Sequence, residues 1–133
     1  MQRSTFLTLC LSIGFAWIGA IQAIGEEKSA GQLRHVVLFK FKESVTKDQV
    51  AEVVAAFGAL PGKIDTIRGF EWGTDVSTEM KADGFTHCFV VTFADVTGRD
   101  EYLPHPEHKK FGELLGQLGV LEDAFVVDYV PGQ

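Results

Sequence analysis

The heptapeptide HVVLFKF, residues 35–41, has the alternating pattern of a β-strand, in which successive side chains point to opposite faces of a sheet. One face would hold His35, Val37, Phe39 and Phe41, and the other Val36, Leu38 and Lys40. Only the lysine is a permanently charged residue, so both faces are largely apolar. A strand of this kind needs to be covered from both sides.

Helical and strand patterns follow one another along the rest of the chain. Thr46 and Gln49 match a capping box, and apolar residues then recur at helical spacing until Pro61 and Gly62 stop the run. Pro106 suits the first position of a later helix. Further strands are predicted over 64–76, 85–93 and 121–130, with a short helical piece over 97–103.

The predicted order is strand, helix, strand, strand, helix, strand, which is the order of a ferredoxin-like βαββαβ domain of the α+β class with an antiparallel sheet. Helices cover only one face of such a sheet. Because the strand over 85–93 is also apolar on both faces, the second face needs another cover. We therefore expect a homodimer in which a second copy of the chain packs on that face.

The first residues of the chain read as a targeting segment rather than as part of the domain. Arg3 is followed by an uncharged, mostly apolar run, with small residues at Ala20 and Ala23. This pattern predicts a signal peptide over 1–23, a linker over 24–32 and a folded domain over 33–133. We expect an exported protein, periplasmic or secreted; the alternative is a membrane anchor that is not cleaved.

The net charge narrows the possible binding partners, and the cysteine content limits the possible disulfides. The formal net charge of −6 disfavours nucleic acid and anionic membrane surfaces as partners, and loss of residues 1–23 would remove the positive charge of Arg3 as well. The same cleavage would leave Cys88 as the only cysteine, so no internal disulfide is expected.

The four histidines are the candidate functional residues. His35 and His87 lie on strands that the fold makes neighbours, and we expect them on one face and close together; the alternative is that each is a core-edge histidine with an ordinary hydrogen-bond partner. His105 and His108 stand at the start of the last helix. With Glu107 they offer a possible metal site, but a catalytic zinc needs three ligands, and we predict no metal.

Proton transfer is the other chemistry that this segment suggests. His108 in the first turn of a helix would be kept largely neutral by the positive end of the helix dipole, and a neutral imidazole accepts a proton. Tyr102 would orient a carbonyl or hydroxyl group while His108 acts as base, if both face an apolar cavity. Four phenylalanines would line that cavity or else form an ordinary core: Phe39, Phe57, Phe89 and Phe111.

Five segments together resemble the stress-responsive A/B barrel (Dabb) family. They are HVVLFKF (35–41), EWGTDVS (71–77), GFTHCFVVTF (84–93), YLPHPEHKKFGELL (102–115) and VVDY (126–129). The resemblance implies a ferredoxin-like subunit, two copies of which form a dimeric α/β barrel. This expectation agrees with the strands that are apolar on both faces.

The family includes a polyketide cyclase that closes a ring by intramolecular aldol condensation without a cofactor, using a Tyr and a His. Similarity to it implies that Tyr102 and His108 are catalytic. The implied ligand-binding positions are His35, Val37, Phe39, Phe57, His87, Phe89, His105 and Phe111.

Three functions remain open from the sequence. We predict a module that binds a small hydrophobic or phenolic molecule in an apolar pocket, without a cofactor. The first alternative is a cofactor-independent enzyme, similar to the polyketide cyclase or to small monooxygenases. The second is a structural dimer whose histidines are packed and inert.

Overall fold

The computed structural model of the protein describes residues 31–133, so the predicted signal peptide and most of the predicted linker lie outside the described residues. The elements are β1 (Leu33–Phe41), α1 (Lys47–Gly58), the 3₁₀ turn η1 (Leu60–Gly62), β2 (Ile67–Thr74), β3 (His87–Phe93), α2 (Val96–Tyr102), α3 (Pro106–Leu118) and β4 (Leu121–Tyr129). This is the predicted βαββαβ order, with η1 added and with α2 at the short helical piece predicted over 97–103.

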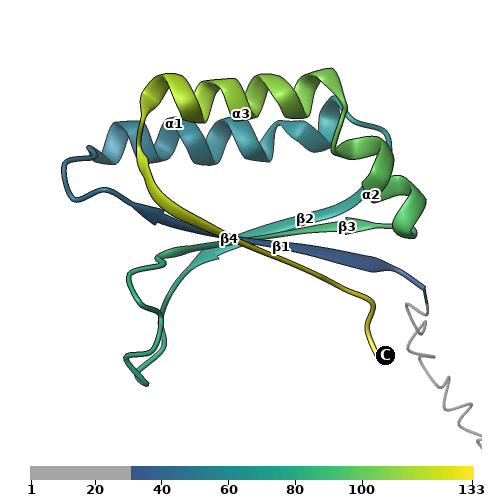
Figure 1. The fold of residues 1–133 in the computed structure, drawn as a ribbon, viewed down its shortest axis with the longest axis horizontal. Helices are drawn as coiled ribbons and strands as arrows, with labels where there is room; N and C mark the ends of the chain where they lie inside the picture. The colour runs from purple at the N-terminus through teal and green to yellow at the C-terminus, as the bar shows by residue number, and fades with distance from the viewer. Residues whose placement is uncertain (1–30) are drawn as a thin grey trace, which may run out of the picture.

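The four strands form one antiparallel sheet in the order β2-β3-β1-β4. The helices α1 and α3 lie on one face of this sheet, whereas the loop between β2 and β3 and the C-terminal end extend on the opposite side (Figure 1). The ferredoxin-like α+β fold expected from the sequence is therefore confirmed.

Local sequence signals account for the helix boundaries. The Thr46 hydroxyl accepts a hydrogen bond from the Gln49 backbone N–H at 3.2 Å, and the Gln49 side chain accepts one from the Thr46 N–H at 3.0 Å, so the predicted capping box is present. Pro106 is the first residue of α3, as expected, because its missing N–H is not needed there. Gly119 ends α3 with a φ of +59°, a conformation that glycine adopts without steric cost.

Three strands are shorter than predicted, whereas β1 begins two residues earlier than the predicted strand over 35–41. The strand expected over 64–76 begins only at Ile67, because the chain before it is still turning: the Ile64 N–H bonds to the Leu60 carbonyl and the Ile67 N–H to the Ile64 carbonyl. The residues after Thr74 leave the sheet in the loop that leads to β3.

An aromatic cluster fills the space between the sheet and the helices. The Phe57 ring lies 4.7 Å from that of Phe89 and 4.6 Å from that of Phe111, and the rings of Phe39 and Phe89 are 5.2 Å apart. All four side chains are buried. The phenylalanines proposed to line a cavity thus pack against one another, and each stabilises the fold by roughly 1.5–3 kcal/mol through burial.

The other side of the sheet is exposed and apolar. In the strand register Leu38 pairs with Cys88 and Phe125, and Val36 with Val90 and Val127. Exposed fractions are 53% for Phe125, 41% for Val127 and 49% for Tyr129. We call this surface the open face, and no helix between residues 31 and 133 packs on it.

Within the same range, none of the helices combines the length and the apolar character that crossing a bilayer requires.

Candidate functional site

Tyr102 is the point at which α2, α3 and the sheet meet. Asp95 caps α2 by accepting a hydrogen bond from the Gly98 N–H at 2.9 Å, and the helix ends at Tyr102. The tyrosine is fully buried, with ring centroids at 4.2 Å from His108, 5.1 Å from Phe93 and 5.7 Å from His35. The fold therefore brings together Tyr102, His108 and His35.

His108 has a defined tautomer. Its Nδ1 lies 2.9 Å from the backbone oxygen of Leu103. A carbonyl oxygen only accepts hydrogen bonds, so Nδ1 carries a proton, and the Nε2 of the neutral ring holds a lone pair. We call Tyr102 and His108 together the Tyr–His site.

Burial keeps both groups of the Tyr–His site uncharged. Desolvation lowers the pKa of His108 below 6.5, and the hydrogen bond to Leu103 acts in the opposite direction. A positive charge on the nearby His35 or His105 ring would lower this pKa further. Burial is the largest of these effects on the His108 ring. Desolvation also raises the pKa of the Tyr102 phenol far above its usual value, so this group remains a donor near neutral pH.

Desolvation, with no hydrogen-bond contribution, accounts for the raised pKa of the Tyr102 hydroxyl. A phenol that keeps its proton is a hydrogen-bond donor. The arrangement thus offers one proton acceptor, His108 Nε2, and one hydrogen-bond donor on adjacent side chains.

His35 is held by two residues that the sequence analysis did not identify. Its Nδ1 lies 2.6 Å from a carboxylate oxygen of Asp128, which stands directly opposite on β4. Asp128 also accepts a hydrogen bond from the guanidinium of Arg99 on α2. The available signal was the acidic residue inside the apolar strand segment VVDY, but its partner on α2 was not evident from the sequence.

The expectation that His35 and His87 come close together is wrong. Both lie on the helix-covered face of neighbouring strands, but antiparallel pairing sets His35 opposite Val91 and His87 opposite Phe39. The two histidines are therefore about 13 Å apart along the strands, at roughly 3.3 Å per residue. His87 instead stacks on Trp72, with ring centroids 6.2 Å apart.

The segment His105-Pro-Glu-His108 is occupied by other interactions. His105 is the N-cap of α3, and its Nδ1 accepts a hydrogen bond from the Glu107 N–H at 3.1 Å. The Glu107 carboxylate pairs with Lys110 at 2.6 Å and Lys63 at 3.4 Å. Across residues 31–133, no three His, Cys, Asp or Glu side chains are grouped so as to hold a metal ion.

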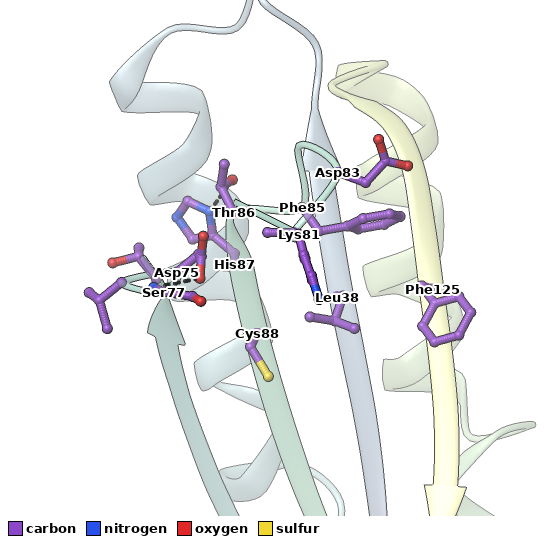
Figure 2. Close-up of a pocket in the computed structure, with 13 residues that line it drawn as sticks. Leu38, Asp75, Ser77, Lys81, Asp83, Phe85, Thr86, His87, Cys88 and Phe125 are labelled. Carbon is purple, nitrogen blue, oxygen red and sulfur yellow. Dashed lines mark hydrogen bonds between the residues drawn. The ribbon is translucent and has the colours of Figure 1, made fainter. Parts of the chain in front are cut away.

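A pocket of about 680 Å³ lies on the open face (Figure 2), and neither Tyr102 nor His108 lines it. Sheet residues Leu38, Cys88 and Phe125 contribute to it, together with the loop between β2 and β3. Of the predicted ligand-binding residues, only His87 contributes to this pocket. Val37 is buried on the helix-covered face of β1.

The fold and the Tyr–His site define a ferredoxin-like α+β subunit with a histidine and a tyrosine at the entrance to its last helix. Residues 33–131 match the family described as Stress responsive A/B Barrel Domain, and the chain belongs to that family. The resemblance noted in the sequence is thereby confirmed.

The similarity extends over nearly the whole length of two relatives. The stress-response A/B barrel domain-containing protein HS1 of Arabidopsis thaliana is 35% identical over 105 residues, which is 79% of this chain and 94% of HS1. Olivetolic acid cyclase of Cannabis sativa is 31% identical over 99 residues, 74% of this chain and 96% of the cyclase.

Solved structures show the same fold. A hydroxynitrile lyase from Passiflora edulis has a TM-score of 0.71 at 25% identity and covers 78% of this chain and 96% of its own. A protein of unknown function from Bacteroides fragilis, described as dimeric and ferredoxin-like, has a TM-score of 0.60 at 29% identity and covers 75% and 96% of the two chains. Homologous structures of this family are thus dimeric.

Proposed function

We propose that this protein is a cofactor-independent acid–base catalyst that binds a small, largely apolar carbonyl or phenolic compound at the Tyr–His site. The observation that carries the proposal is the hydrogen bond from His108 Nδ1 to Leu103, which leaves Nε2 as the proton acceptor beside a buried phenol. Both roles require uncharged groups at neutral pH, and burial shifts both pKa values in the required direction.

The proposed reaction on a ketone begins when His108 Nε2 removes a proton from the carbon next to the carbonyl group. The electron pair of the broken C–H bond forms a C=C bond, and the carbonyl π pair moves to oxygen. The Tyr102 hydroxyl donates a hydrogen bond to this oxygen while its negative charge develops. The imidazolium then returns the proton to carbon or oxygen, so the catalyst is regenerated without an oxidant or reductant.

We expect an uncharged substrate. Arg99 lies beside the Asp128 carboxylate that holds His35, and it already pairs with the carboxylates of Asp100 and Asp128. Its charge is therefore not free to hold a substrate carboxylate. The aromatic side chains around Tyr102 would favour an apolar or aromatic group instead.

Two of the similar proteins support an enzymatic role, since one is named as a cyclase and another as a lyase. Binding without turnover is the second candidate, and the buried Tyr102 hydroxyl, which stays protonated near neutral pH, supports it as a hydrogen-bond donor. A phenol that raises the melting temperature while no proton exchange is catalysed would favour this second function.

The proposed reaction can be tested without knowing the natural product. Phenylacetone, an enolisable aryl ketone, is incubated with the protein in D₂O, and loss of its α-protons is followed by NMR. We expect exchange above the buffer rate, and a loss of roughly 10²-fold or more in His108→Gln, because general base catalysis typically contributes that much. The control is Lys109→Gln, at the exposed neighbouring residue of α3. Equal exchange in His108→Gln and the unchanged protein would exclude His108 as the base.

We further propose that two copies of the chain pack through the open face. Its exposed apolar residues and the dimeric state of homologous structures support this arrangement. The pocket in Figure 2 includes open-face residues, so the second copy would cover it. Sedimentation equilibrium at micromolar concentration should give the mass of a dimer; a monomer would contradict the proposal.

We also propose that residues 1–23 direct export and are then removed. Expression of the full chain followed by mass spectrometry should find a mature protein that begins near Ile24. Full-length protein in the membrane fraction would support the alternative of an uncleaved anchor.

A further inference from the structure

A row of three polar side chains begins at His35, whose ring packs against Tyr102. The His35 ring meets the Tyr102 ring edge to face at 5.7 Å, and its Nδ1 donates to Asp128 at 2.6 Å. Asp128 in turn accepts from Arg99. The three side chains come from β1, β4 and α2, and each is at least three-quarters buried.

Arg99 weakens the effect of the Asp128 carboxylate on the proton affinity of the His35 ring. A carboxylate beside an imidazole favours a second proton on the ring, because the ion pair is stabilised when solvent is largely excluded. The guanidinium is always protonated and already compensates the Asp128 charge. It also repels a second positive charge nearby.

A positive charge on His35 would weaken proton binding at His108. The two rings lie within 5.7 Å and 4.2 Å of the Tyr102 ring, so their centroids are at most about 10 Å apart. A unit positive charge at that separation weakens proton binding by roughly tenfold or more at the effective dielectric constant of about 20 found in proteins. The other charged or titratable groups here are Asp100 beside Arg99 and His105 near His108.

We propose that Arg99 is a positioning residue that acts through Asp128 to keep His35 neutral, so that no positive charge next to Tyr102 opposes proton uptake by His108. This role rests on the proposed acid–base function. It assigns a part in the reaction to a residue that touches neither the substrate nor Tyr102.

The first test reads His35 directly and does not depend on turnover. Imidazole ¹⁵N shifts are followed against pH in the mature protein and in Arg99→Met, a variant that keeps much of the side-chain volume without the charge. We expect His35 in Arg99→Met to take its second proton at a higher pH than in the unchanged protein. Arg99→Lys, which retains the charge, should restore the original behaviour. Identical His35 titrations in Arg99→Met and the unchanged protein would overturn the proposal.

The second test measures the exchange of phenylacetone. Arg99→Met should lower kcat roughly tenfold at pH 7 with little change in KM, because the substrate is uncharged. The double variant Arg99→Met/Asp128→Asn should recover much of this loss, since the carboxylate that would hold the second proton on His35 is then absent. A purely structural contact predicts the opposite, with the double variant at least as impaired as the single one.

The two tests separate the two proposals. Absence of exchange in the unchanged protein would refute the proposed reaction, whereas an unchanged His35 titration would refute the role of Arg99 alone.

Discussion

Replacing Tyr102 by Phe should change stability and activity in opposite directions. The substitution removes one oxygen from a fully buried side chain and keeps the ring contacts with His35, Phe93 and His108. No hydrogen bond contributes to the raised pKa of this hydroxyl, and burying a hydroxyl that lacks a compensating hydrogen bond costs about 1–3 kcal/mol in proteins. We therefore expect Tyr102→Phe to unfold with a free energy that is unchanged or higher by about 1 kcal/mol.

Such a gain would raise Tm by roughly 4–8 °C in a domain of this size. The proposed reaction depends on the same hydroxyl as hydrogen-bond donor to the developing oxyanion. Loss of one such donor typically lowers kcat by about 10²–10³-fold. A side chain kept for packing alone would not show this combination of a stable fold and a lost reaction.

The assays are urea denaturation and phenylacetone exchange, both performed on the mature chain. Tyr129→Phe is the matched control, because it makes the same chemical change on the open face, where the side chain is 49% exposed. It should alter neither quantity by much. A loss of more than 1 kcal/mol in Tyr102→Phe would show that the hydroxyl has a stabilising partner, and full exchange would show that it is not the donor. Either result would refute the reasoning.

Three further predictions follow from the structure. Because burial lowers the pKa of His108, kcat/KM for exchange should fall as the pH decreases and the ring becomes protonated, with a midpoint below 6.5; a midpoint above 6.5 would contradict the assignment. Val127→Asp should turn the dimer into a monomer in sedimentation experiments, whereas Val126→Asp, on the other side of β4, should not. Phe57→Ala should lower the free energy of unfolding by about 3–5 kcal/mol in urea denaturation, since it leaves a cavity among four packed rings.

Local signals were sufficient to predict the order of the elements. The alternation over 35–41 gave β1, the capping box at Thr46 gave the start of α1, and Pro106 gave the start of α3. Each of these depends on residues a few positions apart, so the backbone geometry of a single turn or strand is enough to produce it. Apolar residues on both faces of β1 likewise predicted a sheet with an uncovered face.

The sequence alone determined the class of fold, its family and the Tyr–His motif. The spacing of apolar residues and the capping of a helix depend on residues of a single helix or strand, so they can be read from the sequence. Only the tertiary structure decided which side chains meet. Antiparallel register separated His87 from His35 and set Asp128 opposite His35 instead. The Leu103 carbonyl that fixes the His108 tautomer becomes its partner only when the chain turns between α2 and α3. Such contacts depend on strand register and chain direction, which are set by the packing of the whole domain.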